Sequence, residues 1–171
     1  SKGNPLFALH QLHAWAGANQ LELSDGRYRV PPSALKVRAK TTAELWEERL
    51  AAIPEELRGA ALAASALGGD FPPVVLRALL AALEIPVRPA MEALRRAEIL
   101  LSAGPTRLRW PHALLQEHLL ARLLAHPDAK VVFRAAADAL TLHPAAGTRR
   151  LVGHRVTNLL RAGDNEAAIK L

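Results

Sequence analysis

The sequence contains no cysteine among its 171 residues. This excludes disulfide bridges, thiolate metal sites and cysteine nucleophiles, and it agrees with a reducing compartment. Apolar runs are short and are interrupted by Arg, Glu or Pro. They fall below the roughly 20 residues that a membrane-spanning helix needs. We therefore expect a cytoplasmic protein without a membrane partner.

Motifs for catalysis are also missing. No phosphate-binding loop of the form Gly-x-x-x-x-Gly-Lys-Ser/Thr occurs, and no apolar strand ends in paired acids that could hold Mg²⁺. His10 and His13 are three residues apart, but no further ligand is spaced to complete a metal site. There is no Gly-x-Ser-x-Gly turn for a serine hydrolase. We expect no metal, no catalytic residue and no enzymatic activity in this chain.

Aromatic residues make up only 4% of the chain, whereas Ala, Leu and Arg are abundant, which favours helices. The formal net charge is +6, from 22 basic and 16 acidic residues. A basic balance invites a nucleic-acid partner. However, the arginines are interleaved with glutamates and form no basic run, as in an ordinary solvated surface.

Residues 1–54 are expected to hold two helices and a hairpin. Apolar residues alternate on both sides of Asp25-Gly26, a dipeptide typical of a tight hairpin turn. Thr41 and Glu44 have the spacing of a capping box, which predicts the start of a helix.

Residues 55–126 show the element order of a winged helix, in which three helices precede a small hairpin. A further helix begins near His112. The expected helices lie over 55–67, from Pro72 to Pro86 and from Pro89 to Glu98, and the expected strands over 99–102 and 107–110.

Residues 127–171 are expected to begin a helical-repeat array. Helices are predicted over 129–142 and 147–162, and a Gly163-Asp164 turn then starts another helix. Because one repeat cannot bury both of its faces, we expect the array to continue beyond Leu171. The predicted fold is therefore mainly α, with a helical segment and hairpin, a winged helix, and then TPR-like repeats.

Five stretches in this order resemble a known family. They are "GNPLF", "LWEERLAAIPEELRGAALAASALGG", "AMEALRRAEILL", "RLRWPHALLQEHLL" and "AGDNEAAIKL". Together they resemble the STAND NTPases, AAA-related signalling ATPases that include MalT-like and AfsR-like regulators and the NB-ARC proteins. The resemblance covers essentially the whole chain and depends on the order of the stretches.

The resemblance implies that this sequence is the lid-end, winged-helix and first-repeat part of a longer signalling switch. The parent protein is expected to be an ATPase that binds ATP or ADP with Mg²⁺, alone or fused to a kinase, cyclase or transcription-factor domain. The implied partners are an upstream nucleotide-binding domain of the same chain, a protein or small-molecule signal at the repeats, and further copies on activation. The 171 residues alone are expected to hold no nucleotide.

The resemblance also implies which residues face the nucleotide. Gly3, Asn4 and Pro5 match the lid turn, in which the proline packs against adenine. His112 matches the histidine that reaches the β-phosphate in the resting state, although it stands in Pro-His-Ala where the NB-ARC form has Met-His-Asp. A helix start suits this role, because its free N–H groups favour an anion. The alternative is that His112 only begins a helix packed behind the wing.

A winged helix also allows a second function, DNA binding, in which the third helix enters the major groove. The arginines available for phosphate contacts are Arg95, Arg96, Arg107 and Arg109. Glu92 and Glu98 on the same helix would repel phosphate, and no base-reading Asn/Gln pair is present. We expect no DNA partner and keep a DNA-binding or plain helical interaction module as the alternative function.

Overall fold

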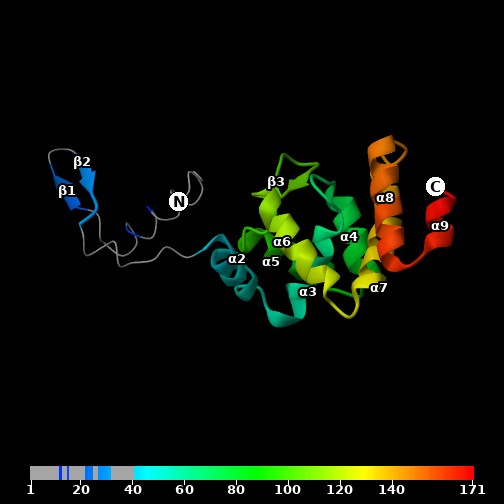
Figure 1. The fold of residues 1–171 in the computed structure, drawn as a ribbon, viewed down its shortest axis with the longest axis horizontal. Helices are drawn as coiled ribbons and strands as arrows, with labels where there is room; N and C mark the ends of the chain where they lie inside the picture. Colours follow the sequence, from blue (N-terminus) through cyan, green and yellow to red (C-terminus); the bar gives the residue numbers. More distant parts are fainter. Residues whose placement is uncertain (1–11, 13–14, 16–21, 25–26, 32–40) are drawn as a thin grey trace. The chain divides into compact units, whose positions relative to one another are not determined.

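A computed structural model describes Leu12, Trp15 and residues 22–24, 27–31 and 41–171 of the chain. The chain divides into two compact units, residues 1–48 and 49–171. The described residues are mainly helical, as predicted, with two small antiparallel hairpins (Figure 1). None of the described helices has both the length and the hydropathy that crossing a bilayer requires. The predicted domain boundaries after residues 54 and 126 stay predictions.

The hairpin in the first unit consists of β1 (Glu22–Ser24) and β2 (Arg27–Arg29), which pair antiparallel with Leu23 opposite Tyr28. This confirms the predicted strands, whereas the turn at Asp25 and Gly26 lies outside the described residues. The helix expected from Pro5 to Asn19 also lies outside them, except for Leu12 and Trp15, which are helical.

The capping box at the start of α2 (Thr42–Ala51) is confirmed. The backbone N–H of Glu44 donates to Thr41 Oγ1 at 3.2 Å, and the N–H of Thr41 donates to Glu44 Oε2 at 2.5 Å. Each side chain thus satisfies a donor that the first turn of a helix leaves unpaired.

The second unit follows the predicted order of helices, hairpin and further helices. α3 packs on α4, α5 and α6, and α7 lies between α4 and α8 (Figure 1). The elements are α3 (Glu55–Ser65), α4 (Pro73–Ala82), α5 (Val87–Arg96), β3 (Leu101–Ser102), β4 (Leu108–Arg109), α6 (Ala113–Leu124), α7 (Ala129–Ala139), the 3-10 helix η2 (Leu140–Leu142), α8 (Arg149–Ala162) and α9 (Asn165–Ile169).

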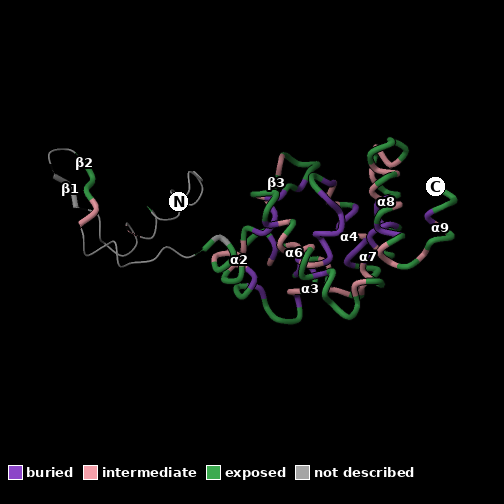
Figure 2. Tube along the Cα trace, in the orientation of Figure 1, coloured by how far each residue is buried: buried purple, intermediate pink, exposed green. Residues whose placement is uncertain are grey.

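The core of this unit is formed by α3 and the helices around it. Figure 2 shows buried residues along α3, α4 and α7, where these helices face one another. α3 is rich in alanine, and small side chains let neighbouring helices approach it closely. Its buried alanines are Ala60, Ala61, Ala63 and Ala64, each 0% exposed. The space between α3 and the surrounding helices is filled by buried leucines of those helices, chiefly Leu76, Leu80, Leu94, Leu115 and Leu119.

The second hairpin is fastened to the α3–α4 connection. Strands β3 and β4 pair with Ser102 opposite Leu108. Phe71, in the connection, exchanges two hydrogen bonds with Leu108: its N–H donates to Leu108 O at 3.1 Å and its carbonyl accepts from Leu108 N–H at 2.8 Å. Both residues are buried, so the bridge fixes the hairpin against the helices.

Several predicted boundaries differ from the structure by one to four residues, and at α5 and β3 the reasons lie in the helix ends. α5 begins at Val87 rather than at Pro89, because a proline is tolerated anywhere in the first turn, whose N–H groups have no helical partner. Strand β3 begins at Leu101 rather than at Ile99. The N–H groups of Ile99 and Leu100 donate to Leu94 O at 2.9 and 3.2 Å, so these residues close α5 instead of pairing in the hairpin.

Each of two helices, α4 and α5, is followed by a non-glycine residue in the left-handed conformation. Glu84 follows α4 with φ +57°, and Glu98 follows α5 with φ +52°. In each case the next residue donates its N–H back to the helix, Ile85 to Leu80 O and Ile99 to Leu94 O, both at 2.9 Å. This is the Schellman arrangement, in which glycine is the usual residue at the left-handed position.

Replacing Glu84 with glycine should stabilise the protein by roughly 0.5–1 kcal/mol, because relief of the left-handed strain exceeds the added chain entropy. Glu98→Gly is the matched control, since it also removes the ion pair of Glu98 with Arg49, at 3.1 Å. Glu98→Gly should gain less stability than Glu84→Gly, because it loses a partly exposed ion pair that contributes about 0.2–1 kcal/mol. Urea denaturation measures both, and a lower stability for Glu84→Gly would contradict the account of strain.

Candidate functional site

Backbone carbonyls at and just after the C-terminal end of α3 accept hydrogen bonds from side chains that are distant in the sequence. The carbonyls at the end of a helix have no partner within the helix. Gln116 on α6 donates from Nε2 to Ser65 O at 2.9 Å, and Trp110 donates from Nε1 to Gly68 O at 2.7 Å. The Trp110 ring also meets Phe71 edge-on, with centroids 6.5 Å apart. The end of α3 is thereby held by α6 and by the segment after β4.

The carbonyl of Ala66 accepts two further donors, both from α8. His154 Nε2 and Asn158 Nδ2 each lie 2.9 Å from Ala66 O. A carbonyl can only accept, so His154 carries a proton on Nε2. Asn158 is 0% exposed, so this contact is made out of water. We call the group Ser65, Ala66, Gly68, His154 and Asn158 the junction.

Gly68 lets α8 approach the junction. Its φ is +83°, a conformation that residues with a Cβ rarely adopt. A Cβ built on Gly68 would lie 2.7 Å from Cε1 of His154. Glycine is therefore required here both by the backbone and by the imidazole packed against it.

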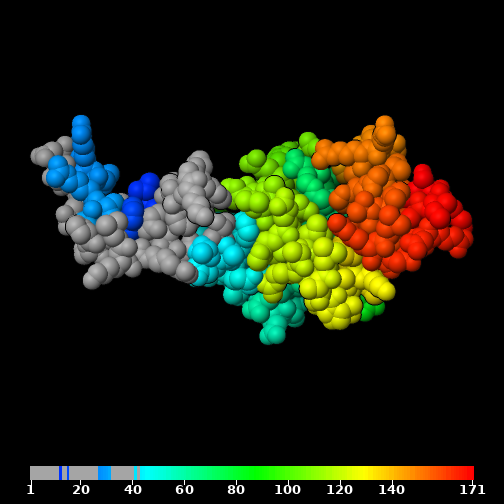
Figure 3. Space-filling model, in the orientation of Figure 1, coloured from blue at the N-terminus to red at the C-terminus, as the bar shows by residue number. Residues whose placement is uncertain are grey.

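Two cavities share Arg107 and His143, and the first of them lies beside the junction, because His154 is part of its lining. The first has a volume of about 510 Å³, and its polar lining is Asp70, Arg107, His143, Thr148, Arg150 and His154. The second has a volume of about 550 Å³ and is lined largely by Pro72, Pro73, Val74, Pro105 and Pro144. In Figure 3 the orange surface of the α7–α8 connection and α8 borders the green surface of the preceding helices and hairpin.

His143 is the titrating group with a shifted pKa in these cavities. Burial, and secondly the positive charge of Arg107, lower the pKa of His143 from its ordinary value of 6.5. His143 Nδ1 accepts a hydrogen bond from the N–H of Ala145 at 3.0 Å. The neutral imidazole therefore carries its proton on Nε2, which can donate.

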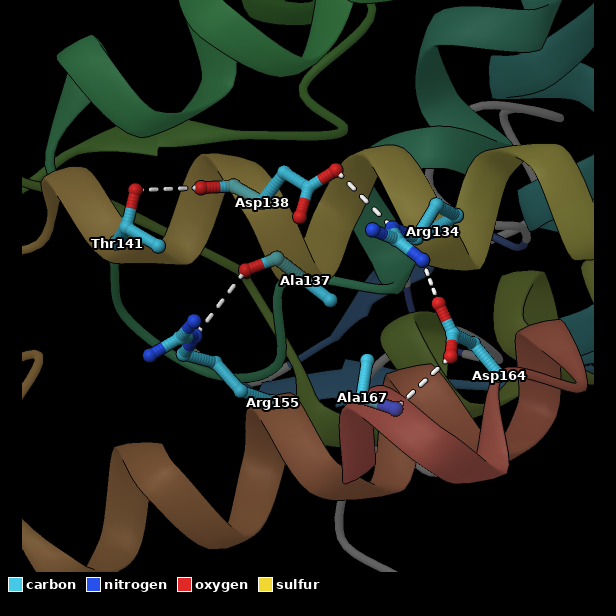
Figure 4. Close-up of polar contacts among 7 residues, drawn as sticks. All are labelled: Arg134, Ala137, Asp138, Thr141, Arg155, Asp164 and Ala167. Atoms are coloured by element: carbon cyan, nitrogen blue, oxygen red, sulfur yellow. Dashed lines mark hydrogen bonds and ion pairs between the residues drawn. The ribbon is translucent and has the colours of Figure 1, made fainter. Parts of the chain in front are cut away.

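Polar contacts join the last three helices (Figure 4). Arg155 on α8 donates from Nε to Ala137 O of α7 at 3.3 Å. Arg134 on α7 pairs with Asp138 at 3.3 Å and with Asp164, the residue before α9. Asp164 Oδ1 also accepts from Ala167 N–H at 3.0 Å and so caps α9. The start of α9 is therefore fixed to α7 as well as to α8.

His112 lies where the sequence predicts, at the start of α6. It has extended backbone dihedrals, φ −144° and ψ 138°, and its side chain makes no capping hydrogen bond. It is exposed, and no other described residue forms a hydrogen bond or ion pair with its imidazole. Gly3, Asn4 and Pro5 lie outside the described residues, so their placement beside His112 stays a prediction.

The four predicted arginines lie on two elements. Arg95 and Arg96 are exposed on α5, and Arg107 and Arg109 are exposed in the hairpin, Arg109 on β4. The two acids expected to repel phosphate both have arginine partners. Glu92 pairs with Arg88 at 3.1 Å, and Glu98 pairs with Arg49. DNA binding by α5 stays a separate prediction.

Sequence reasoning missed the cavity and the junction. Of the predicted arginines, Arg107 lines the first cavity, together with His143, Arg150 and His154. The one available signal was the spacing of His154 and Asn158, four residues apart and so on one face of α8. Among the described residues, no three His, Asp or Glu side chains gather closely enough to hold a metal ion.

Gly68→Ala should destabilise the protein by about 1–3 kcal/mol more than Gly163→Ala. The two glycines have nearly the same φ, +83° and +82°, so the backbone strain is matched. A Cβ at Gly163 meets nothing within 4 Å, whereas one at Gly68 would displace His154 from Ala66. Urea denaturation compares the two variants, and equal losses would mean that the contact with His154 adds nothing.

The titration midpoint of His143 should lie below 6.5 and should rise part of the way back in Arg107→Gln. The Arg107 charge is the smaller of the two causes that lower the pKa of His143, so its removal leaves the larger effect of burial in place. Because the folded state binds this proton more weakly, the group's contribution to stability is present above pH 6.5 and declines as the pH falls through the unfolded pKa. NMR titration of the imidazole measures the shift. Arg109→Gln, outside the cavity lining, is the control, and an unchanged midpoint in Arg107→Gln would refute the charge effect.

Comparison of the chain with family models, with curated protein sequences and with solved structures gave no match.

Proposed function

We propose that this chain is the coupling part of a STAND-type signalling ATPase. In this proposal residues 55–126 form a winged helix and residues 127–171 begin a TPR-like array. The winged helix responds to the nucleotide held by an upstream domain, and the array carries that response to a sensor arm. The proposal has three supports, which are the element order, the junction and the position of His112.

The element order of α3 to β4 supports the winged helix. Its three helices precede the hairpin, and Phe71 between the first and second helices pairs with Leu108 of β4. The connection thus adds a strand-like residue to the hairpin. This order of helix, strand-like residue, two helices and hairpin is the topology expected of a winged helix.

The contacts of the last three helices support the start of an array. α7 packs more extensively on α8 than any other two described elements pack together, and α8 packs on α9. Gly163 ends α8 in the left-handed conformation, and α9 begins two residues later. Because each helix contacts mainly its neighbours, the segment has the stacked arrangement of repeat proteins.

The single observation that carries the coupling role is the pair of α8 side chains on the carbonyl of Ala66. A flexible linker would absorb a movement of the winged helix. Two directional hydrogen bonds with a buried donor on α8 would instead make α3 and α8 move as one body. Coupling between sites needs such a continuous set of packed and hydrogen-bonded contacts.

His112 supplies the contact that would sense the nucleotide. Its exposure counts against the alternative in which it only packs behind the wing. The N–H groups of α6 before Leu115 have no helical acceptor, and the positive end of the helix dipole lies beside the imidazole. A β-phosphate held there would bias the winged helix toward its resting position.

In the full-length protein, His112→Ala should weaken ADP binding about tenfold or more, because a hydrogen bond to a charged group contributes about 1.5–3 kcal/mol. The control is His126→Ala, an exposed histidine just beyond the other end of α6, roughly 18 Å away along a helix of 12 residues. This variant should bind ADP like the unchanged protein. Equilibrium binding of a fluorescent ADP analogue measures both.

Two outcomes would overturn the proposal. One is unchanged ADP affinity in His112→Ala. The other is a coding sequence that has no phosphate-binding loop upstream of Ser1. The second result would favour the alternative function, a helical protein-interaction or DNA-binding module without an ATPase.

A further inference from the structure

We propose that the two cavities beside the junction form one binding site for a small phosphate monoester with an apolar body. The phosphate binds in the first cavity, and the body lies against the prolines of the second. This site is separate from the nucleotide contact at His112. It does not depend on the presence of an ATPase domain, so either proposal can fail without the other.

The first cavity has the charge that a phosphate requires. Arg107 comes from the hairpin and Arg150 from α8, and both line the cavity. Among the described residues, neither guanidinium forms an ion pair. Asp70 is the one acid in the described lining, which leaves an excess of positive charge. Unpaired guanidinium groups that converge from two elements bind phosphate oxygens well, because each presents several N–H donors.

Residues with further hydrogen-bond donors line the first cavity. The neutral imidazole of His143 carries its proton on Nε2, because Nδ1 accepts from Ala145. Arg150 and Leu151 lie in the first turn of α8, where backbone N–H groups have no helical acceptor. These groups complement the two arginines, but the positive charge of the cavity carries the assignment.

The second cavity fits an apolar group. Four prolines and Val74 supply apolar walls, while Arg77 and Thr106 add polar groups to the lining. Arg107 and His143 line both cavities, so a ligand can pass from one to the other beside these two side chains. The volumes, about 510 and 550 Å³, fall within the range of roughly 300–1,000 Å³ that is typical of small-molecule pockets. Cavities of this volume can hold a whole small molecule, so the proposed ligand is a free metabolite rather than a phosphorylated segment of a protein.

The first test uses phenyl phosphate, inorganic phosphate and phenol as probes of the 171-residue chain, with binding followed by isothermal titration calorimetry. Phenyl phosphate should bind at least about fivefold more tightly than phosphate, because burial of its ring adds apolar contact. Phenol should not bind measurably. Equal affinities for phenyl phosphate and phosphate would remove the second cavity from the site, and no binding of either phosphate compound at millimolar concentrations would overturn the proposal.

The second test uses variants of matched charge. Arg107→Gln and Arg150→Gln should each weaken phenyl phosphate binding about tenfold, as expected for the loss of a charge-assisted contact. Arg149→Gln is the control, because Arg149 is the exposed neighbour of Arg150 on α8 and does not line the cavity. The affinity of Arg149→Gln for phenyl phosphate should stay within about twofold of that of the unchanged protein. An equal loss in Arg149→Gln would show a general attraction to positive charge and would overturn the site.

Two further measurements keep the result clear. Val74→Asn should reduce the preference for phenyl phosphate without changing the affinity for phosphate, and the opposite pattern would contradict the two-cavity assignment. Melting of each variant without ligand checks the fold, and Arg150→Lys replaces Arg150→Gln if the latter unfolds early. A phosphotyrosine peptide that binds more tightly than phenyl phosphate would overturn the small-molecule assignment in favour of a protein partner.

Discussion

The structure of the second unit depends on how the backbone after α3 is satisfied. A helix end leaves carbonyls unpaired, and burying them without partners would cost about 1–3 kcal/mol each. Here α6, the segment after β4 and α8 each send a side chain to these carbonyls, and Ala66 receives two from α8. One helix terminus therefore organises three other elements. The cavities, the approach at Gly68 and the position of α8 all follow from this arrangement.

Local patterns predicted the order of the elements well. The capping box at Thr41 and Glu44 and the Gly163-Asp164 turn are confirmed in atomic detail, because each depends on residues close in sequence. The strands around Asp25-Gly26 are confirmed for the same reason. Helix ends were harder, since Glu84 and Glu98 occupy left-handed positions where a sequence pattern would call for glycine.

The junction could not be predicted from the sequence, because its partners are far apart along the chain. His154 and Asn158 are 88 and 92 residues from Ala66. Nothing in the local sequence of α8 specifies which distant carbonyl it meets. Likewise, Arg107 was predicted as an arginine of the wing, but its place beside His143 and Arg150 depends on how α7 and α8 pack. The position of His112 at a helix start was predictable, because a helix start is a local feature.

The amide of Asn158 gives the junction a bond to Ala66 that does not depend on pH. Asn158 does not titrate at all. His143 lines the adjacent cavity, and burial and the charge of Arg107 lower its pKa. Acidification therefore adds positive charge inside the cavity, while the bond from Asn158 to Ala66 is unaffected.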